Sequence, residues 1–445
     1  MNNYDNVIAA ISTSYATAAI SVIRVSGNNC LNILSNIFSN KNINKILPRT
    51  TVFTHIISKD NFIIDDCILV SYKAPLSFTG EDMLEINIHG GILVTQKVLL
   101  RILEEDVRLA SPGEFTLRAY LNNKLSLIEA ESINDIINAK NEIALKIATN
   151  GLHKGTLNIT STLKNQILDI LSKIEVQIDY PEYEEFKDFS KNIINNEIKP
   201  LIEYVSTLLI KSNKTMLIKE GFPVAIIGAP NTGKSSLLNL LLDKNKAIVT
   251  SIPGTTRDLI EDSINLKGLT INFIDTAGIR NTVDEIEKIG ITKTKEVINK
   301  AVLLLVVIDS CVSITKEDKE ILKLVKNKDF IIVNNKIDIG TKSNSNNYIN
   351  ISTVTKEGLK ELEDAITSKL KFNEITSDFN YFSNIRQIDL LENIKKTLEE
   401  INVYDNIGIL AYNIGRVLKY ILELSGEEYN ELLTSSIFSK FCVGK

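Results

Sequence analysis

The sequence has few of the residues that build disulfide frameworks and metal centres. Its 445 residues include four cysteines and three histidines. The cysteines stand far apart, without the C-x-x-C spacing of a zinc-ligand pair, and the histidines have no paired spacing either. Both absences argue against a disulfide-stabilised secreted domain and against a zinc site.

Long apolar runs and an excess of positive charge are also missing. No apolar stretch approaches the roughly 20 residues that cross a bilayer, and the first residues lack the basic flank and apolar core of a signal peptide. We therefore expect a cytoplasmic protein with no membrane segment. The formal net charge is −5, so we expect any contact with RNA to be local or shared with a partner.

The chain is longer than one hydrophobic core supports, and its patterns change along the sequence. Residues 1–118 mix short β-like runs with turn signals, which indicates an α+β domain. Residues 119–215 and 376–445 show helical periodicity, and we predict that they pack together as one all-helical domain because each has an apolar stripe that needs a partner. The stripes contain Leu163, Ile167, Ile170, Ile174 and Ile178 in the first stretch, and Leu391, Ile394, Leu398, Ile401, Ile414, Val417, Leu418 and Ile421 in the second.

Between the helical stretches, residues 216–375 alternate strand-like runs with helical runs, which predicts a doubly wound, mostly parallel sheet. A phosphate-binding loop lies near the start of this segment. Gly228–Ser235 reads G-A-P-N-T-G-K-S and fills every fixed position of the G-x-x-x-x-G-K-[ST] motif, between a strand-like run and a helical run. Backbone N–H groups in such a loop converge on a phosphate at the positive end of the helix dipole. We predict that Lys234 reaches the β- and γ-phosphates and that Ser235 binds Mg²⁺.

Three later segments complete a guanine-nucleotide site in the required order. Residues 250–256 supply switch-segment hydroxyls, with Thr256 as the expected second Mg²⁺ ligand, and residues 275–278 read D-T-A-G after a strand-like run. Residues 335–338 read N-K-I-D, and the Asp338 carboxylate can accept two hydrogen bonds from guanine that adenine does not offer. The predicted GTP-binding residues are Asn231, Thr232, Gly233, Lys234, Ser235, Ser236, Thr250, Ser251, Ile252, Pro253, Gly254, Thr255, Thr256, Asp275, Thr276, Ala277, Gly278, Asn335, Lys336, Asp338, Ser352 and Thr353.

One position indicates how hydrolysis differs from that of Ras. Ras-like enzymes place a water-orienting glutamine directly after the D-x-x-G glycine, whereas this chain has Ile279, which cannot form a side-chain hydrogen bond. The activating group is then an acid farther along, Glu285 or Glu287, or a cation beside the transferring phosphate. The predicted fold class is therefore multidomain α/β: an N-terminal α+β domain, an all-α helical domain, and an inserted Ras-like P-loop GTPase domain.

Further motifs match a known family over the whole chain. They read F-T-G-E-D at 78–82, I-H-G-G at 88–91, S-P-G-E-F at 111–115, L-N-N-K-L at 121–125 and F-C-V-G-K at 441–445. With the order of the nucleotide motifs and with Ile279, they make the chain resemble the MnmE (TrmE) family of tRNA modification GTPases. One segment departs: residues 12–19 lack the glycines of the family's Gly-rich stretch, so we expect their backbone to avoid positive φ.

The resemblance implies a folate-dependent activity. It implies a homodimer whose N-terminal domain binds 5-formyl-tetrahydrofolate, or a related one-carbon folate, through Arg24, Glu85, Lys124 and Lys445. It also implies a flavoprotein partner, MnmG (GidA), that carries FAD and uses NADH in a heterotetramer-type complex holding tRNA jointly. The product would be an aminomethyl or carboxymethylaminomethyl group at C5 of the wobble uridine, position 34, of certain tRNAs.

The resemblance further implies K⁺ in the GTPase site. K⁺ would promote docking of two nucleotide domains and take the place of an arginine finger. The matching K⁺ ligands are Asn231, Thr250, Ile252 and Thr255, and Glu287 matches the family's water-positioning glutamate. A different function stays open: a GTP-switched ribosome-assembly or regulatory GTPase without one-carbon chemistry. The role of Cys442 also stays open.

Overall fold

The computed structural model forms two compact units. One consists of Met1–Asn134 and Ile421–Lys445, and the other of Asp135–Tyr420. In the described part of both units, no helix has the length and apolar character to pass through a bilayer. The described residues are 6–40, 42–153, 155–180, 189–245, 262–274, 296–340, 347–370, 381–402, 406–427, 437, 438, 441 and 444.

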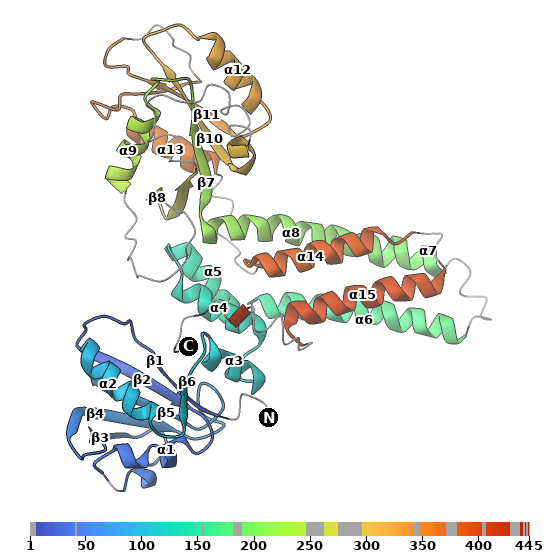
Figure 1. Ribbon diagram of the computed structural model, residues 1–445. Helices are drawn as coiled ribbons and strands as arrows, with labels where there is room; N and C mark the ends of the chain where they lie inside the picture. Colours follow the sequence, from blue (N-terminus) through green and yellow to red (C-terminus); the bar gives the residue numbers. More distant parts are fainter. Residues whose placement is uncertain are drawn as a thin grey trace. The chain divides into compact units, whose positions relative to one another are not determined.

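The first unit contains a six-stranded sheet in the order β3-β4-β5-β2-β1-β6 (Figure 1). Its strand pairs are antiparallel, apart from the parallel pair of β1 and β6. Helix α2 contacts five of the strands, and Ile23 and Val25 of β2 belong to the buried core on that side of the sheet. Because side chains alternate along a strand, Arg24 lies on the opposite face. The strands are β1 (Val7–Ile11), β2 (Ile20–Ser26), β3 (Thr51–Ile57), β4 (Ile63–Tyr72), β5 (Met83–His89) and β6 (Val107–Leu109).

Two aromatic residues from late in the sequence complete the first unit. The rings of Phe438 and Phe441 lie 5.1 Å apart and share a buried cluster with Leu117, Leu127 and Ala130. The carbonyl oxygen of Phe438 packs directly against Gly113, so closely that a Cβ at Gly113 would collide with it. The helices of this unit are α1 (Cys30–Ile33), α2 (Ile92–Leu103), α3 (Glu114–Leu121) and α4 (Leu127–Ile137, which ends in the second unit), with 3₁₀ turns at Ser35–Ile37 and Ile43–Lys45.

The second unit contains the doubly wound sheet that the sequence predicts. Its strand order is β12-β11-β10-β7-β9-β8, and all neighbours are parallel except the β8–β9 hairpin. Buried apolar clusters on the two faces account for the almost continuous apolar run of β10. The elements are β7 (Phe222–Ile227), α9 (Lys234–Asn245), β8 (Asp262–Leu266), β9 (Leu269–Phe273), β10 (Leu303–Asp309), α12 (Lys316–Val325), β11 (Phe330–Asn335), β12 (Ile349–Ile351) and α13 (Leu359–Lys369).

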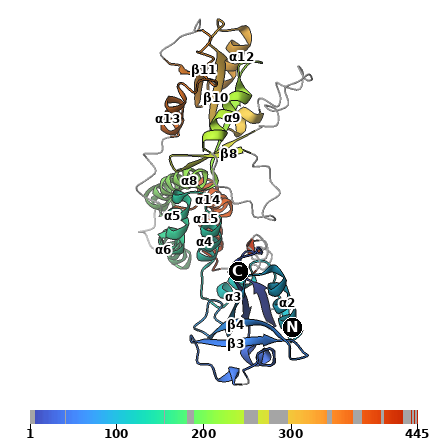
Figure 2. The same cartoon turned by 90° about the vertical axis from the view of Figure 1, so that its left-hand side faces the viewer.

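Long helices from both ends of this unit's sequence form one bundle. Helix α8 packs along α14, and Figure 2 shows α6 and α15 in the same bundle. The bundle combines helices that precede and follow the nucleotide-binding sheet in the chain, as the two apolar stripes predict. The helices are α5 (Glu142–Leu152), α6 (Gly155–Asp179), α7 (Phe189–Ile193), α8 (Lys199–Glu220), α14 (Ile385–Glu399) and α15 (Ile407–Ser425, which ends in the first unit), with a π turn at Ile194–Ile198.

The predicted fold class is confirmed, and one predicted stripe is partly wrong. Leu163, Ile167, Ile170 and Ile174 of α6 are buried, whereas Ile178 is 45% exposed. Ile178 has the right helical spacing but lies in the last turn of α6, beyond the buried part of the stripe. The segment boundaries 1–118, 119–215, 216–375 and 376–445 stay predictions. Residues 12–19 have no positive φ, as their lack of glycine predicts.

Candidate functional site

The phosphate-binding loop connects strand β7 to helix α9. Gly228 and Gly233 have φ of 158° and 92°, and a Cβ at either position would collide with its neighbours, so only glycine fits. Lys234 begins α9, and its Nζ donates to the carbonyl oxygens of Gly228 (3.0 Å) and Ala229 (2.7 Å). The ammonium group is therefore held over the loop, where a phosphate at the N-terminus of α9 would meet it.

The N-K-I-D motif, residues 335–338, contacts the same loop. Asn335 is fully buried at the end of β11, and its Nδ2 donates to the carbonyl oxygen of Thr232 at 2.9 Å. Its Oδ1 accepts from the backbone N–H of Thr353 at 3.3 Å. The hydroxyl of Ser352 donates to Asp338 Oδ1 at 2.6 Å. The structure therefore brings the predicted loop, N-K-I-D motif and following serine together, with the Asp338 carboxylate exposed and oriented by Ser352.

Asp309, which the sequence analysis missed, also belongs to this site. The Nζ of Lys336 donates to Asp309 Oδ2 and to the carbonyl oxygen of Asn231, both at 2.7 Å. Burial acts to raise the pKa of Asp309, but hydrogen bonds from Lys336 and from the Cys311 N–H outweigh it and hold the pKa below its usual range. Asp309 ends β10, and its place at the carboxyl end of a parallel strand was the available signal.

Replacing Asp309 by asparagine tests whether the Asp309–Lys336 ion pair supports nucleotide binding. The Lys336 ammonium group would then meet a neutral amide oxygen in place of a carboxylate, so we expect GDP affinity to fall about fivefold to tenfold. Titration with a fluorescent GDP analogue measures the change. In a double-mutant cycle, the variant that carries both Asp309→Asn and Lys336→Ala should lose less binding free energy than the sum of the losses in the two single variants. An affinity within twofold of the unmodified protein would refute the link. Because the pKa of Asp309 is lowered, the link should persist to lower pH than an ordinary aspartate allows.

Several of the predicted site residues lie outside the part of the chain that the structure describes. They are residues 250–256 and 275–278, Glu285, Glu287, Ile279, Cys442 and Lys445. Of the other predicted positions, Ser235 and Ser236 lie in the first turn of α9, and Asn231 is exposed in the loop with φ of 61°.

The comparisons with known proteins cover nearly the whole chain. Residues 127–442 match the model of the MnmE helical domain, and residues 7–124 match that of the GTP-binding protein TrmE N-terminus. The chain is 45% identical to the tRNA modification GTPase MnmE of Acholeplasma laidlawii, over 98% of this chain and 99% of that protein. The chain belongs to the MnmE family of tRNA modification GTPases.

Two further MnmE proteins give the same result. The chain is 43% identical to MnmE of the Aster yellows witches'-broom phytoplasma and 38% identical to MnmE of Bacillus anthracis, over 99% of this chain and 99% of each relative. The protein is therefore a GTP-hydrolysing enzyme that acts in tRNA modification.

A second polar cluster lies on the sheet face of the first unit that α2 does not cover. Arg24 of β2 and Glu85 of β5 are direct cross-strand partners, and the guanidinium donates to Glu85 Oε1 at 2.8 and 3.2 Å. The Tyr72 hydroxyl donates to Glu85 Oε2 at 3.1 Å. Burial and the charge of Glu85 raise the pKa of Tyr72, so its phenol stays a donor at neutral pH. Sequence analysis did not identify Tyr72 as a member of this cluster.

MnmE-family motifs from three segments surround this cluster. The Arg24 guanidinium lies 5.4 Å from the ring centre of Phe78 and 5.9 Å from that of Phe115. The Lys124 side chain is exposed and packs against Gly80, where a Cβ would lie 3.1 Å from Lys124 Cγ. Arg24 and Lys124 therefore both contact the F-T-G-E-D motif.

The glycine of the F-C-V-G-K motif lies against the first strand. Gly444 has φ of 94°, and a Cβ there would collide with the carbonyl oxygen of Ile11. The Ser12 hydroxyl donates to the Gly444 carbonyl oxygen at 3.1 Å. Ile11 pairs with Ile23, the neighbour of Arg24. Residues 12–19, which lack the glycines of the family's Gly-rich stretch, thus contribute a hydrogen bond that holds residue 444 near the strand that carries Arg24.

A buried charge network holds these motifs in place. Arg118 is 1% exposed and donates to Glu81 at 3.0 Å and to Glu114 at 3.0 Å. Glu81 also accepts from the Ser26 hydroxyl at 2.8 Å. Burial opposes ionisation of Glu114, but hydrogen bonds from Arg108 and the Ser111 N–H, with the charge of Arg118, lower its pKa. The F-T-G-E-D and S-P-G-E-F motifs are therefore joined through Arg118.

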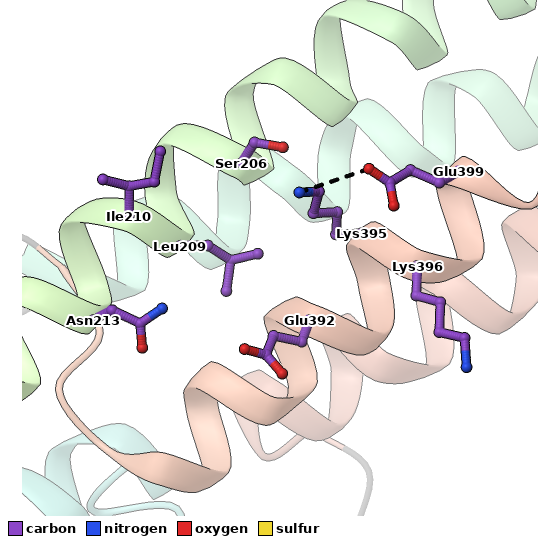
Figure 3. A pocket seen from close by; sticks show the side chains of 8 residues that line it. All are labelled: Ser206, Leu209, Ile210, Asn213, Glu392, Lys395, Lys396 and Glu399. Atoms are coloured by element: carbon purple, nitrogen blue, oxygen red, sulfur yellow. Dashed lines mark ion pairs between the residues drawn. The ribbon is translucent and has the colours of Figure 1, made fainter. Parts of the chain in front are cut away.

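The helical bundle has a shallow groove of about 370 Å³ between α8 and α14 (Figure 3). Lys395 and Glu399 on its rim form an ion pair of 3.6 Å and are 34% and 52% exposed. Two acidic and two basic side chains line the rim, and solvent screens them, so the groove does not concentrate charge for an anionic ligand. It is lined by Ser206, Leu209, Ile210, Asn213, Glu392, Lys395, Lys396 and Glu399.

Proposed function

We propose that this GTPase is K⁺-dependent and acts with an FAD-containing flavoprotein of the MnmG (GidA) type. The pair would add an aminomethyl or carboxymethylaminomethyl group to C5 of the wobble uridine, position 34, with a carbon derived from formyl-tetrahydrofolate. The observation that carries the folate part is the Arg24–Glu85–Tyr72 cluster, a charged and aromatic constellation on the sheet face opposite α2.

The cluster suits a folate in its donors and acceptors. A folate has a planar pterin with N–H donors and an anionic glutamate tail, so Glu85 can accept from the ring while Arg24 and Lys124 meet carboxylates. Glu85 Oε1 accepts both bonds from Arg24, whereas Oε2 accepts one bond from Tyr72 and retains a lone pair for a ligand. Lys445 follows Gly444, which the Ser12 bond holds at β1, and would supply a further cation.

In the GTPase site, the proposed metal ligands come from both described and undescribed segments. Ser235 and Thr256 would hold Mg²⁺, and Asn231, Thr250, Ile252 and Thr255 would hold K⁺. These cations supply positive charge where phosphoryl transfer spreads negative charge. Lys234 adds the same charge from the loop, and Glu287 would orient the attacking water, which Ile279 cannot do.

The proposed assembly is a cytoplasmic homodimer that joins the flavoprotein in a heterotetramer-type complex. The net charge of −5 supports joint binding of tRNA, because the chain has no overall positive field for it. FAD and NADH would be bound by the partner only.

Two measurements on the purified protein test this proposal. GTP hydrolysis should be clearly faster in K⁺ than in Na⁺ at equal ionic strength. Calorimetry should show binding of 5-formyl-tetrahydrofolate that weakens roughly tenfold to a hundredfold in Arg24→Ala and Glu85→Gln, since each loses a charge-assisted hydrogen bond. Lys97→Ala is the control, because Lys97 is exposed on α2, which covers the other face of the sheet.

The opposite results would favour the regulatory alternative. Equal rates in both salts together with no folate binding would contradict the proposal. Unchanged wobble uridines in tRNA from a deletion strain would indicate a GTP-switched assembly factor without one-carbon chemistry.

A further inference from the structure

Strand β9 joins the nucleotide-binding sheet to the helices through its polar side chains. Leu269, Ile271 and Phe273 face the apolar core of the sheet, so the alternate residues Thr270 and Asn272 face the other way. Asn272 Nδ2 donates to the carbonyl oxygen of Glu220 at 2.9 Å, at the end of α8. Thr270 is 3% exposed, and its Oγ1 accepts from Asn141 Nδ2 at 2.9 Å.

Asn141 binds three elements with one side chain. Its Oδ1 accepts from the Ala144 N–H at 2.7 Å and caps helix α5. Its Nδ2 donates to Thr270 of β9 and, at 3.4 Å, to the carbonyl oxygen of Ile218 in α8. Asn141 is 9% exposed, so breaking one of these bonds leaves a buried polar group without its partner. The start of α5 is therefore coupled to the position of β9.

Apolar packing makes the same connection. Ile143 and Ile147 of α5, 8% and 3% exposed, belong to the same core cluster as Val224 of β7 and Ile271 of β9. Ile143 Cδ1 also lies 4.0 Å from where a Cβ at Gly268 would stand, in the turn just before β9. Close-packed side chains do not deform continuously, so a shift of β9 is expected to move α5 or to disrupt this packing.

An ion pair continues the connection into the bundle. Lys219 of α8 binds Asp135 at 2.7 Å and donates to the carbonyl oxygen of Ser383 at 3.2 Å, just before α14. The side chains of Lys219 and Asp135 are 19% and 13% exposed, which limits the screening of this ion pair by solvent. Lys219 therefore bonds one residue that precedes the nucleotide-binding sheet in the chain and one that follows it. Both bonds lie at the end of α8 that leads into β7.

In sequence, the D-T-A-G motif starts two residues after β9. We propose that Asn141 is a positioning residue for the GTPase site and that its bond to Thr270 transmits the nucleotide state of the sheet to α5 and the helical bundle. The inference goes beyond the proposed function and rests on GTP hydrolysis alone; it needs neither folate nor K⁺ nor a flavoprotein.

Hydrogen exchange in the full-length protein tests the proposal. Amides in the first turn of α5 are compared at saturating GDP and at a saturating non-hydrolysable GTP analogue, so that a change in affinity does not enter the comparison. We expect their exchange rates to differ about fivefold or more between the two nucleotides. Thr270→Val removes the hydroxyl with little change in shape and should abolish most of that difference, whereas Thr270→Ser keeps the hydroxyl and should retain it.

The pair of variants separates coupling from packing. The same nucleotide-dependent difference in Thr270→Val as in the unmodified protein would overturn the proposal. Loss of the difference in Thr270→Ser would overturn it too, because the hydroxyl would then not be the connection. If Thr270→Val does not fold, Asn141→Ser replaces it: the serine hydroxyl can still cap α5, but serine has no second polar group for Thr270. The difference should again be lost, and its retention would refute the link.

Discussion

Replacing Asp338 by asparagine is expected to lower GTP affinity about a hundredfold or more and to shift preference toward xanthosine nucleotides. Guanine offers two donors to the carboxylate, and asparagine would set its own NH₂ group against one of them. The 2-oxo group of xanthine accepts from that NH₂ group instead. Asparagine can still accept from the Ser352 hydroxyl, so the loop geometry should survive. Titration with fluorescent GDP and XDP measures both affinities.

Asp329→Asn is the matched control for this experiment. Asp329 precedes the same strand, β11, at its opposite end, and its side chain is 67% exposed. Its replacement removes the same charge from the unit without touching the base-recognition motif, so GDP affinity should be unchanged. If Asp338→Asn also bound GDP normally, Asp338 would not be the group that reads the base.

Replacing Lys234 by alanine is expected to reduce GTP hydrolysis about a hundredfold to a thousandfold. The ammonium group is held over the loop by two carbonyl oxygens and would stabilise the negative charge that develops on the phosphate. Burial lowers the pKa of Lys234, and phosphate favours the protonated form. GTP affinity should therefore fall as the pH rises through this pKa, starting at lower pH than for an exposed lysine.

Phosphate release at saturating GTP measures the effect of Lys234→Ala. Lys323→Ala is the control, because Lys323 is exposed on α12 in the same unit. A rate for Lys234→Ala within tenfold of the unmodified protein would rule out the assigned role, and loss of the pH dependence in the variant would support it.

The nucleotide site was predictable because its chemistry follows local sequence. Gly228, Gly233 and Lys234 stand at fixed spacing, and the strand before them and the helix after them follow from apolar periodicity. Asn335 and Asp338 directly follow a strand, so their place at the carboxyl edge of a parallel sheet could be inferred. In the structure, Asn335 bonds the loop at Thr232, and Ser352 bonds Asp338.

Contacts between distant segments were not predictable from one sequence. Tyr72 reaches Glu85 only because β4 and β5 pair in one register, and no local pattern sets that register. Asn141 has the sequence of an ordinary helix cap, and its second bond to Thr270 depends on how α5 packs against the sheet. Arg118 is a charged residue that periodicity does not place inside a core, yet three partners hold it there.

The aromatic cluster of the first unit has a consequence for the order in which the protein matures. Leu117 and Leu127 are made early, but Phe438 and Phe441, which bury them, leave the ribosome only after residues 135–420. At a synthesis speed of about 5–20 residues per second, that wait lasts roughly 15–60 s. During that interval Leu117 and Leu127 lack the two rings that cover them in the finished structure, so we expect the first unit to be completed last.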